Sequence, residues 1–285
     1  MTNGLTRSKT LPNIFRILLI ISISPNLSFL EINQDVHLFL WRSKISIYSP
    51  LLCCQVTIML INSLKRSGLR IDFHCHTIAS KDSLTSFEGL LRASRRKDLS
   101  RLVITDHNTI AGALAAQKLD PERIILGEEI MTARGEILAA YATEEVPPGL
   151  SPRETIKCLR EQGAFISVAH PFDVWRSGHW ELDDLLEIAP LVDAIEIFNA
   201  RCMKPGANRQ AMEFAREHNL PGTAGSDAHA AFEVGRACLV LPQFEGADGL
   251  RTVIRQGRVV GRMSPFWVHF ASRYAALRGR LKVKG

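Results

Sequence analysis

The chain has 285 residues, of which 46% are hydrophobic and 22% are charged. These are ordinary values for globular proteins, and they exclude a wholly disordered, a collagen-like and a disulfide-scaffold chain. The net charge of +6 is unevenly distributed: residues 1–70 carry +6, residues 71–250 carry −9 and residues 251–285 carry +9. An acidic body therefore lies between two basic ends. The six cysteines show no disulfide or zinc-ribbon spacing, so we expect a reducing, cytoplasmic compartment.

Residues 1–66 differ from the rest of the chain because they are rich in Ile, Leu and Ser and contain few acids. Their uncharged stretches, residues 17–30 and 45–64, are respectively too short and only borderline for a membrane-spanning helix, which needs about 20 mainly apolar residues. We therefore expect an N-terminal extension that is poorly structured or not part of the native product, with Met59 as an alternative start. Membrane contact of this extension is the less favoured alternative.

From residue 67 onward, short apolar runs alternate with helical stretches. The expected strands cover residues 69–75, 101–105, 124–126, 136–141, 164–169, 194–198, 222–225, 238–241 and 259–261. The expected helices cover residues 85–97, 109–118, 151–163, 208–218 and 246–255. The first of them opens on a capping box of Thr85 and Glu88, and the third on a box of Ser151 and Glu154. This alternation predicts an α/β architecture with largely parallel strands.

A polar cluster follows, or ends, six of the expected strands. The clusters cover residues 72–76, 105–109, 127–129, 169–171, 198–201 and 225–229. The active sites of barrels and open α/β sheets form at the carboxyl ends of the strands. Six clusters in this position therefore indicate a functional site rather than a pattern of core packing.

The clusters are rich in side chains that bind divalent metal ions. His74 and His76 are two residues apart in a strand and therefore face the same side. The candidate ligands are His74, His76, Asp82, His107, Glu129, His170, Asp227 and His229. A single zinc ion takes three or four protein ligands, so this number indicates a site for two or three metal ions. The mixture of imidazole and carboxylate suits Mn²⁺, Zn²⁺ or Fe²⁺, and paired ions suit the hydrolysis of phosphate esters.

Other polar residues near these clusters have more than one interpretation. Asn199 contacts the substrate or caps the following turn, and Arg201 is the best candidate to hold a substrate phosphate by two hydrogen bonds. Asp106 is a metal ligand or, in the interpretation that we favour, accepts a hydrogen bond from His107 and so orients that imidazole toward the metal. Within the site we assign catalytic roles to His107, Asp227 and Arg201, and substrate binding to Asn199 and Arg201.

Five motifs resemble, in their order along the chain, those of the PHP (polymerase and histidinol phosphatase) family. They are Phe73-His74-Cys75-His76-Thr77, Ile104-Thr105-Asp106-His107-Asn108, Gly127-Glu128-Glu129-Ile130, Ala169-His170-Pro171 and Gly225-Ser226-Asp227-Ala228-His229. The resemblance covers residues 69–240 and implies a distorted seven-stranded (β/α) barrel with a dinuclear or trinuclear metal site at the carboxyl ends of its strands. It also implies phosphoesterase chemistry.

We expect a division of the chain into residues 1–66, the PHP domain with its C-terminal extension at 67–242, and a basic helical segment at 243–285 that packs on the barrel. The resemblance to small stand-alone members of the family implies that the chain is a nucleoside 3′,5′-bisphosphate phosphatase or a 5′→3′ exonuclease acting on short oligonucleotides.

Two positions depart from the family pattern. Asp82 comes one residue late in the first loop, and Glu136 stands where many members carry a histidine ligand. Glu136 supplies an oxygen ligand, or that ligand is missing.

Several alternatives remain open. A phosphatase of the histidinol-phosphate type fits the same chemistry, and a non-catalytic, metal-stabilised binding module is the alternative of another class. An amidohydrolase is less favoured, because residues 136–141 contain no lysine that could bridge two metals. We expect a phosphorylated small molecule or a short oligonucleotide as the partner, and no stable protein partner. The basic end, residues 251–284, is a solvated helical face or a surface that captures nucleic acid.

Overall fold

The computed structural model describes residues 68–282, and these residues form one sheet of nine strands covered by helices. The expectations for residues 1–66 lie outside the described residues. The strands are β1 (Leu69–Cys75), β2 (Arg101–Ile104), β3 (Ile124–Met131), β4 (Glu136–Ala140), β5 (Phe165–Val168), β6 (Ala194–Asn199), β7 (Gly222–Gly225), β8 (Ala237–Leu241) and β9 (Arg258–Gly261). Across the sheet they follow the order β7-β6-β5-β4-β3-β2-β1-β8-β9.

The sheet curls until β1 meets the residues that follow β7. Cys75 forms a parallel bridge with Ala228, and the amide of His76 donates a hydrogen bond of 2.9 Å to the Ala228 carbonyl. Gly225 permits this close approach, because a Cβ atom at that position would lie 2.2 Å from the Cβ of His74. Strands β1 to β7 therefore form the expected nearly closed barrel, and β8 and β9 extend the sheet beyond β1.

Strand β4 runs opposite to the largely parallel arrangement expected from the sequence. It pairs in antiparallel fashion with both β3 and β5, whereas β1–β2, β2–β3, β5–β6 and β6–β7 are parallel pairs. The connection between β3 and β4 covers only residues 132–135, which is too short for a crossover and long enough for a hairpin. The reversal places Glu136, the first residue of β4, beside Met131 at the carboxyl end of β3.

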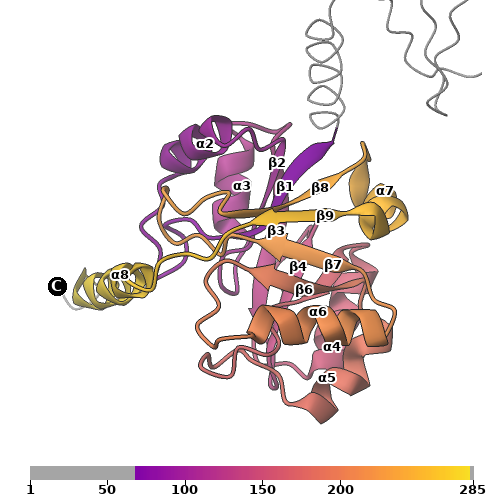
Figure 1. Ribbon diagram of the computed structural model, residues 1–285. Helices are drawn as coiled ribbons and strands as arrows, with labels where there is room; N and C mark the ends of the chain where they lie inside the picture. The colour runs from indigo at the N-terminus through magenta and orange to yellow at the C-terminus, as the bar shows by residue number, and fades with distance from the viewer. Residues whose placement is uncertain (1–67, 283–285) are drawn as a thin grey trace, which may run out of the picture. The chain divides into compact units, whose positions relative to one another are not determined.

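Helices cover the outside of the sheet. They are α2 (Phe87–Arg96), α3 (Ala111–Gln117), α4 (Pro152–Glu161), α5 (Leu182–Ile188), α6 (Ala207–Glu217), α7 (Gly246–Val253) and α8 (Val268–Lys282). Figure 1 shows α2 and α3 on one flank of the sheet, α4, α5 and α6 on another, and α8 projecting from the body. Helix α5 was not expected from the sequence, and residues 243–282 contain β9 as well as two helices. No helix of the described part of the chain combines the length and the apolar character needed to cross a membrane.

The two predicted capping boxes have different outcomes. Helix α4 begins as predicted: the Ser151 hydroxyl accepts from the Glu154 amide, and the Glu154 carboxylate accepts from the Ser151 amide. The prediction for α2 was wrong, because its N-cap is Ser86, whose hydroxyl accepts a 3.1 Å bond from the Gly89 amide. Thr85 is instead buried in the preceding loop, where its amide donates to the Ser83 hydroxyl.

Buried apolar side chains fix the strands against one another. Phe73 of β1, Val103 of β2 and Phe165 of β5 belong to one buried cluster, and the rings of Phe73 and Phe165 lie 6.4 Å apart. A second cluster joins Leu159 of α4 to Ile166 of β5. Because close-packed interiors resist deformation, these contacts hold the carboxyl ends of the strands, and the polar side chains there, in a fixed arrangement.

Candidate metal centre

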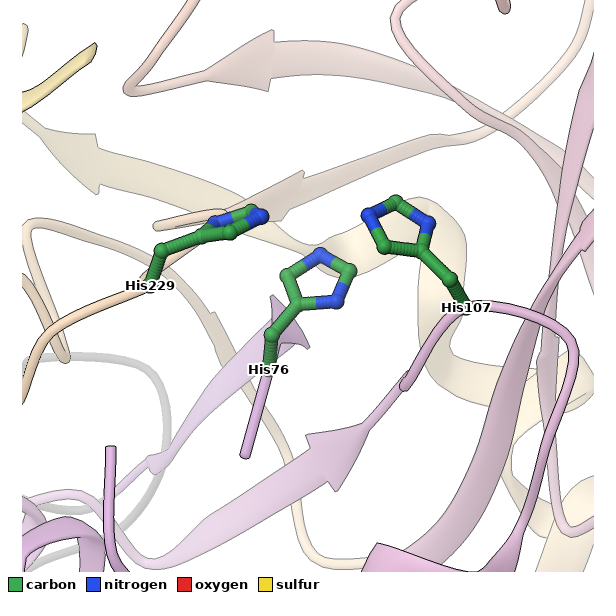
Figure 2. A group of neighbouring side chains, drawn as sticks. All are labelled: His76, His107 and His229. Carbon is green, nitrogen blue, oxygen red and sulfur yellow. The ribbon is translucent and has the colours of Figure 1, made fainter. Parts of the chain in front are cut away.

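All eight predicted metal ligands gather at one end of the barrel. His74 comes from β1, and His76 and Asp82 follow it; His107 follows β2, Glu129 lies in β3, His170 follows β5, and Asp227 and His229 follow β7. Figure 2 shows the imidazoles of His76, His107 and His229 grouped side by side. The ring of His76 lies 4.5 Å from that of His107 and 4.2 Å from that of His229, measured between centroids.

Glu129 lies among four of the imidazoles. Its Oε1 is 3.1 Å from the Nε2 of His170 and 3.3 Å from the Nε2 of His74. Its Oε2 is 2.9 Å from the Nδ1 of His107 and 3.4 Å from the Nε2 of His76. The sequence placed Glu129 after a strand that ends at residue 126, but β3 continues to Met131 and holds the carboxylate rigidly.

Asp227 presents one of its two carboxylate oxygens to the cluster. Its Oδ2 forms an ion pair with Arg176 Nη1 at 2.6 Å and accepts a hydrogen bond from Asn199 Nδ2 at 3.0 Å. Its Oδ1 is buried without a hydrogen-bond donor, 3.3 Å from His76 Nε2 and 3.4 Å from His229 Nδ1. The backbone of Asp227 has a φ of 52°, a left-handed conformation that is uncommon outside glycine and that concentrates at functional sites.

The open edge of the cluster is formed by His107 and Asp82. Their side chains are 32% and 31% exposed, whereas the other six predicted ligands are buried. The Oδ2 of Asp82 lies 3.1 Å from His229 Nε2 and 3.6 Å from His107 Nε2. A substrate entering from solvent would therefore meet these two side chains first.

Glu196 of β6, which was not predicted, orients two of the histidines. Its Oε1 is 3.0 Å from the Nδ1 of His74, and its Oε2 accepts a 2.8 Å hydrogen bond from the His170 amide. A carboxylate behind a ligating imidazole fixes the orientation of the ring and raises its basicity. One signal was available: Glu196 interrupts an otherwise apolar strand, and a buried charge requires a partner.

Asp106 acts through a loop rather than on His107 itself. It accepts hydrogen bonds from the Thr77 amide at 2.7 Å, from the Thr77 hydroxyl at 2.6 Å and from the Ser80 hydroxyl at 2.6 Å. The Ser80 oxygen also lies 3.3 Å from His76 Nδ1 and accepts a 3.1 Å bond from the His107 amide. The Asp106–Ser80 pair thereby positions both histidines.

Glu136 reaches the cluster as a possible oxygen donor. Its Oε2 lies 3.4 Å from His170 Nε2, and its Oε1 lies 3.9 Å from His107 Nδ1. The position is a consequence of the reversed β4, which brings the first residue of that strand to the mouth of the barrel.

Asn199 and Arg201, expected to contact substrate, are buried against protein groups. The Asn199 amide nitrogen donates to Glu196 and Asp227, and its Oδ1 accepts from the Arg201 amide. The Arg201 guanidinium donates to the Ser272 hydroxyl at 2.6 Å and lies 3.5 Å from Glu233. A second arginine was not predicted: the side chain of Arg176, in the loop after β5, is 18% exposed and forms an ion pair with Asp227.

Burial and neighbouring charges separate the protonation states within the cluster. Burial lowers the pKa of His76, and the charge of His229 lowers it further, to about 4. Burial would raise the pKa of Asp227, but Arg176 and His74 outweigh it and hold that pKa well below its usual range. At neutral pH, His76 therefore offers a free lone pair and Asp227 a negative charge, which are the states that a metal ion requires.

The donor set fits divalent metal ions. The Nε2 atoms of His74 and His76 face each other at 3.1 Å, and Glu129 Oε2 and Asp227 Oδ1 are buried acceptors without donors. Metal ions among these atoms would satisfy all four. Four groups of three residues each bring their ligand atoms within 4.8 Å of one another: His76 with His107 and His229, His74 with His170 and Asp227, His74 with His76 and Glu129, and His107 with Glu129 and Glu136.

Comparison with known proteins points to one family. A family model described as PHP-associated matches residues 205–259. The uncharacterized protein MJ0417 of Methanocaldococcus jannaschii is 37% identical over 172 residues, which cover 59% of this chain and 69% of that protein.

Two solved structures share the fold. A two-domain protein of Bacteroides vulgatus, described as containing a predicted PHP-like metal-dependent phosphoesterase, matches with a TM-score of 0.54 and 17% identity, covering 68% of this chain and 65% of that one. The lesion-specific endonuclease PfuEndoQ of Pyrococcus furiosus matches with a TM-score of 0.51 and 18% identity, covering 67% of this chain and 57% of that one.

Proposed function

The chain belongs to the PHP family of metal-dependent phosphoesterases, and from that premise we propose that it hydrolyses phosphate esters of nucleotides. The finer activity is removal of phosphate from nucleoside 3′,5′-bisphosphates, or 5′→3′ shortening of short oligonucleotides. The observation that supports this proposal most strongly is the pair of donorless buried oxygens, Glu129 Oε2 and Asp227 Oδ1, set among imidazole nitrogens. Buried carboxylate oxygens without hydrogen-bond partners lower the stability of the folded chain unless cations bind to them.

The metal-binding residues are the eight predicted from the sequence, with Glu136 as an additional oxygen donor. Together they would hold two or three ions of Mn²⁺, Zn²⁺ or Fe²⁺. Bound ions of this kind activate water for attack on phosphorus and offset the negative charge of the phosphate.

The chain's own residues supply orientation and charge. Arg176 adds a fixed positive charge beside Asp227, and its partial exposure lets it contact a phosphate oxygen at the mouth. His107 lies on the exposed edge, so a metal ion that it helps to hold would face the ester that enters. Arg201 has protein partners for its guanidinium, so we assign it a positioning role for the Asp227 turn.

A side-by-side assay tests the proposal. Purified protein is supplied with Mn²⁺ and offered adenosine 3′,5′-bisphosphate, short single-stranded RNA and histidinol phosphate. We expect turnover of one or both nucleotide substrates, and its loss in His76→Ala and Asp227→Asn. His218→Ala is the matched control, because His218 is exposed on the far end of α6 and should retain full activity.

The same assay separates the alternatives. Turnover of histidinol phosphate alone would replace the nucleotide substrate with a small-molecule one. Bound metal without turnover of any ester would favour the non-catalytic binding module. Full activity in both site variants would contradict the assignment of the metal centre itself.

A further inference from the structure

Helix α8 carries an aromatic face that is largely exposed in the part of the chain that the structure describes. Phe270 and Tyr274 are 61% and 62% exposed, and Leu277 continues the same row at 56%. Their spacing of four and three residues places them on one side of the helix. The other side is packed, because Val268 and Ala275 are buried. Large exposed apolar side chains in a contiguous row mark an interaction surface.

The row continues toward the metal centre. Phe266 and Trp267 precede α8 and are also exposed. The ring of Trp267 lies 5.3 Å from that of Phe232, which belongs to the same loop as His229. We define the aromatic platform as Phe232, Phe266, Trp267, Phe270 and Tyr274.

Arg201 ties the platform to the metal centre. Its Nη2 donates to the Ser272 hydroxyl at 2.6 Å and to the Val268 carbonyl at 3.5 Å, both in the first two turns of α8. Its Nη1 donates to the carbonyl of Asp227 at 3.4 Å. One buried guanidinium therefore holds both the start of α8 and a turn that carries a candidate metal ligand, so the platform begins at the rim of the centre.

The chain segment that carries most of the platform is basic, which suits a polyanion. Residues 251–285 contain nine basic and no acidic residues, whereas residues 71–250 carry a net charge of −9. Arg262 and Arg273, on either side of Trp267 in the sequence, are exposed. Phosphate backbones bind to such basic segments and avoid acidic surfaces. Surfaces that bind single strands combine basic residues with aromatic rings on which bases stack.

We propose that the aromatic platform binds single-stranded nucleic acid and delivers a phosphate ester of the bound strand to the metal centre. This inference rests on the proposed nucleotide-directed phosphoesterase function and deepens it, because it favours an oligonucleotide over a mononucleotide as the substrate. Bases stack on the flat rings while the backbone follows the arginines. A membrane or a second copy of the chain would bury the apolar area of these side chains, and aliphatic side chains would serve that purpose as well as aromatic rings. Base stacking, in contrast, requires the rings.

The test replaces rings with apolar side chains that cannot stack. The double variant Phe270→Leu, Tyr274→Leu keeps the apolar area of the helix, and Met212→Ala, an exposed apolar site on α6, is the control. Binding of a labelled, hydrolysis-resistant phosphorothioate oligonucleotide is measured by fluorescence anisotropy on the metal-loaded full chain. We expect at least tenfold weaker binding in the double variant, a matching rise in KM for an ordinary oligonucleotide, and unchanged turnover of adenosine 3′,5′-bisphosphate. The control should bind like the wild type.

Each other outcome has a distinct meaning. Unchanged oligonucleotide binding in the double variant, or an equal loss of bisphosphate turnover, would overturn the platform. A wild type that bound no oligonucleotide would also overturn it. If that wild type instead dimerised in sedimentation or bound phosphatidylserine vesicles, and the leucine variant did the same, the face would be an apolar contact surface. If the wild type bound the oligonucleotide but hydrolysed neither the oligonucleotide nor adenosine 3′,5′-bisphosphate, the proposed function would be wrong and the proposal that the platform binds nucleic acid would stand.

Discussion

Replacing Gly225 by alanine tests how closely the metal centre depends on closure of the barrel. A Cβ atom at residue 225 would lie 2.2 Å from the Cβ of His74, 2.8 Å from its amide nitrogen and 2.9 Å from its Cα. Ordinary contacts begin at 3.4 Å, and these neighbours lie on or next to the backbone, so no change of rotamer relieves the clash. Strand β1 must therefore move away from β7 by about 1 Å, a displacement that can lower catalytic efficiency about 100-fold.

Overpacking of this kind costs about 1–3 kcal/mol of unfolding free energy. For a domain of this size each kcal/mol lowers Tm by about 2–4 °C, so we expect Gly225→Ala to lose roughly 2–12 °C. We also expect it to bind less Mn²⁺ and to lose about two orders of magnitude in kcat/KM. Thermal unfolding, metal content and ester hydrolysis measure the three effects on the same preparation.

The matched control lies on the same strand. The three atoms nearest to a Cβ atom at Gly222 all belong to the side chain of Ile197, the closest at 2.3 Å, and this half-buried side chain can move. Gly222→Ala should therefore lose some stability and keep its metal and its activity. If Gly225→Ala remained folded with wild-type metal content and wild-type kcat/KM, the link between barrel closure and the position of His74 would be refuted.

Two further predictions concern the surroundings of the ligands. Ser80→Ala removes the hydroxyl between Asp106 and His76, and we expect metal affinity to fall about 10- to 100-fold in a calorimetric titration; unchanged affinity would argue against a positioning role. Burial opposes charge on His74 and His107, yet nearby carboxylates raise the pKa of both well above the ordinary value. Their protons must leave before metal binds, so apparent affinity for Mn²⁺ should rise with pH, and a flat profile would contradict this account.

The gathering of the candidate ligands could be predicted because most of them lie in short motifs whose local structure is simple. The alternation of β1 places His74 on one face, and the turn after β7 supplies Asp227. The parallel pairing of most strands then brings these ends to one edge of the barrel without any information from distant parts of the sequence.

The direction of β4 could not be inferred from its own residues, because an apolar run has the same pattern in either direction. The informative signal was the length of the connection, residues 132–135, which admits a hairpin and excludes a crossover. The same reversal explains why Glu136 lies among the ligands.

The position of Arg176 beside Asp227 was not predicted, for a different reason. It lies in an irregular loop after β5, which has no periodic pattern, and its partner Asp227 is far away in the sequence. Arg201 was favoured instead because it directly follows a strand. The structure shows its guanidinium buried against Ser272 and Glu233, in a segment whose packing the sequence pattern did not reveal.

Metal content tests the central claim most directly. Protein reloaded with Mn²⁺ and freed of excess metal is analysed by mass spectrometry of the metal per chain, for the wild type and for Glu129→Gln. Glu129 lies within reach of four imidazoles, so its replacement by a neutral side chain of the same shape should disrupt more than one ion. We predict at least two ions per wild-type chain and a clear loss in Glu129→Gln. One ion or none in the wild type, or the same content in both proteins, would contradict a multinuclear centre built on this cluster.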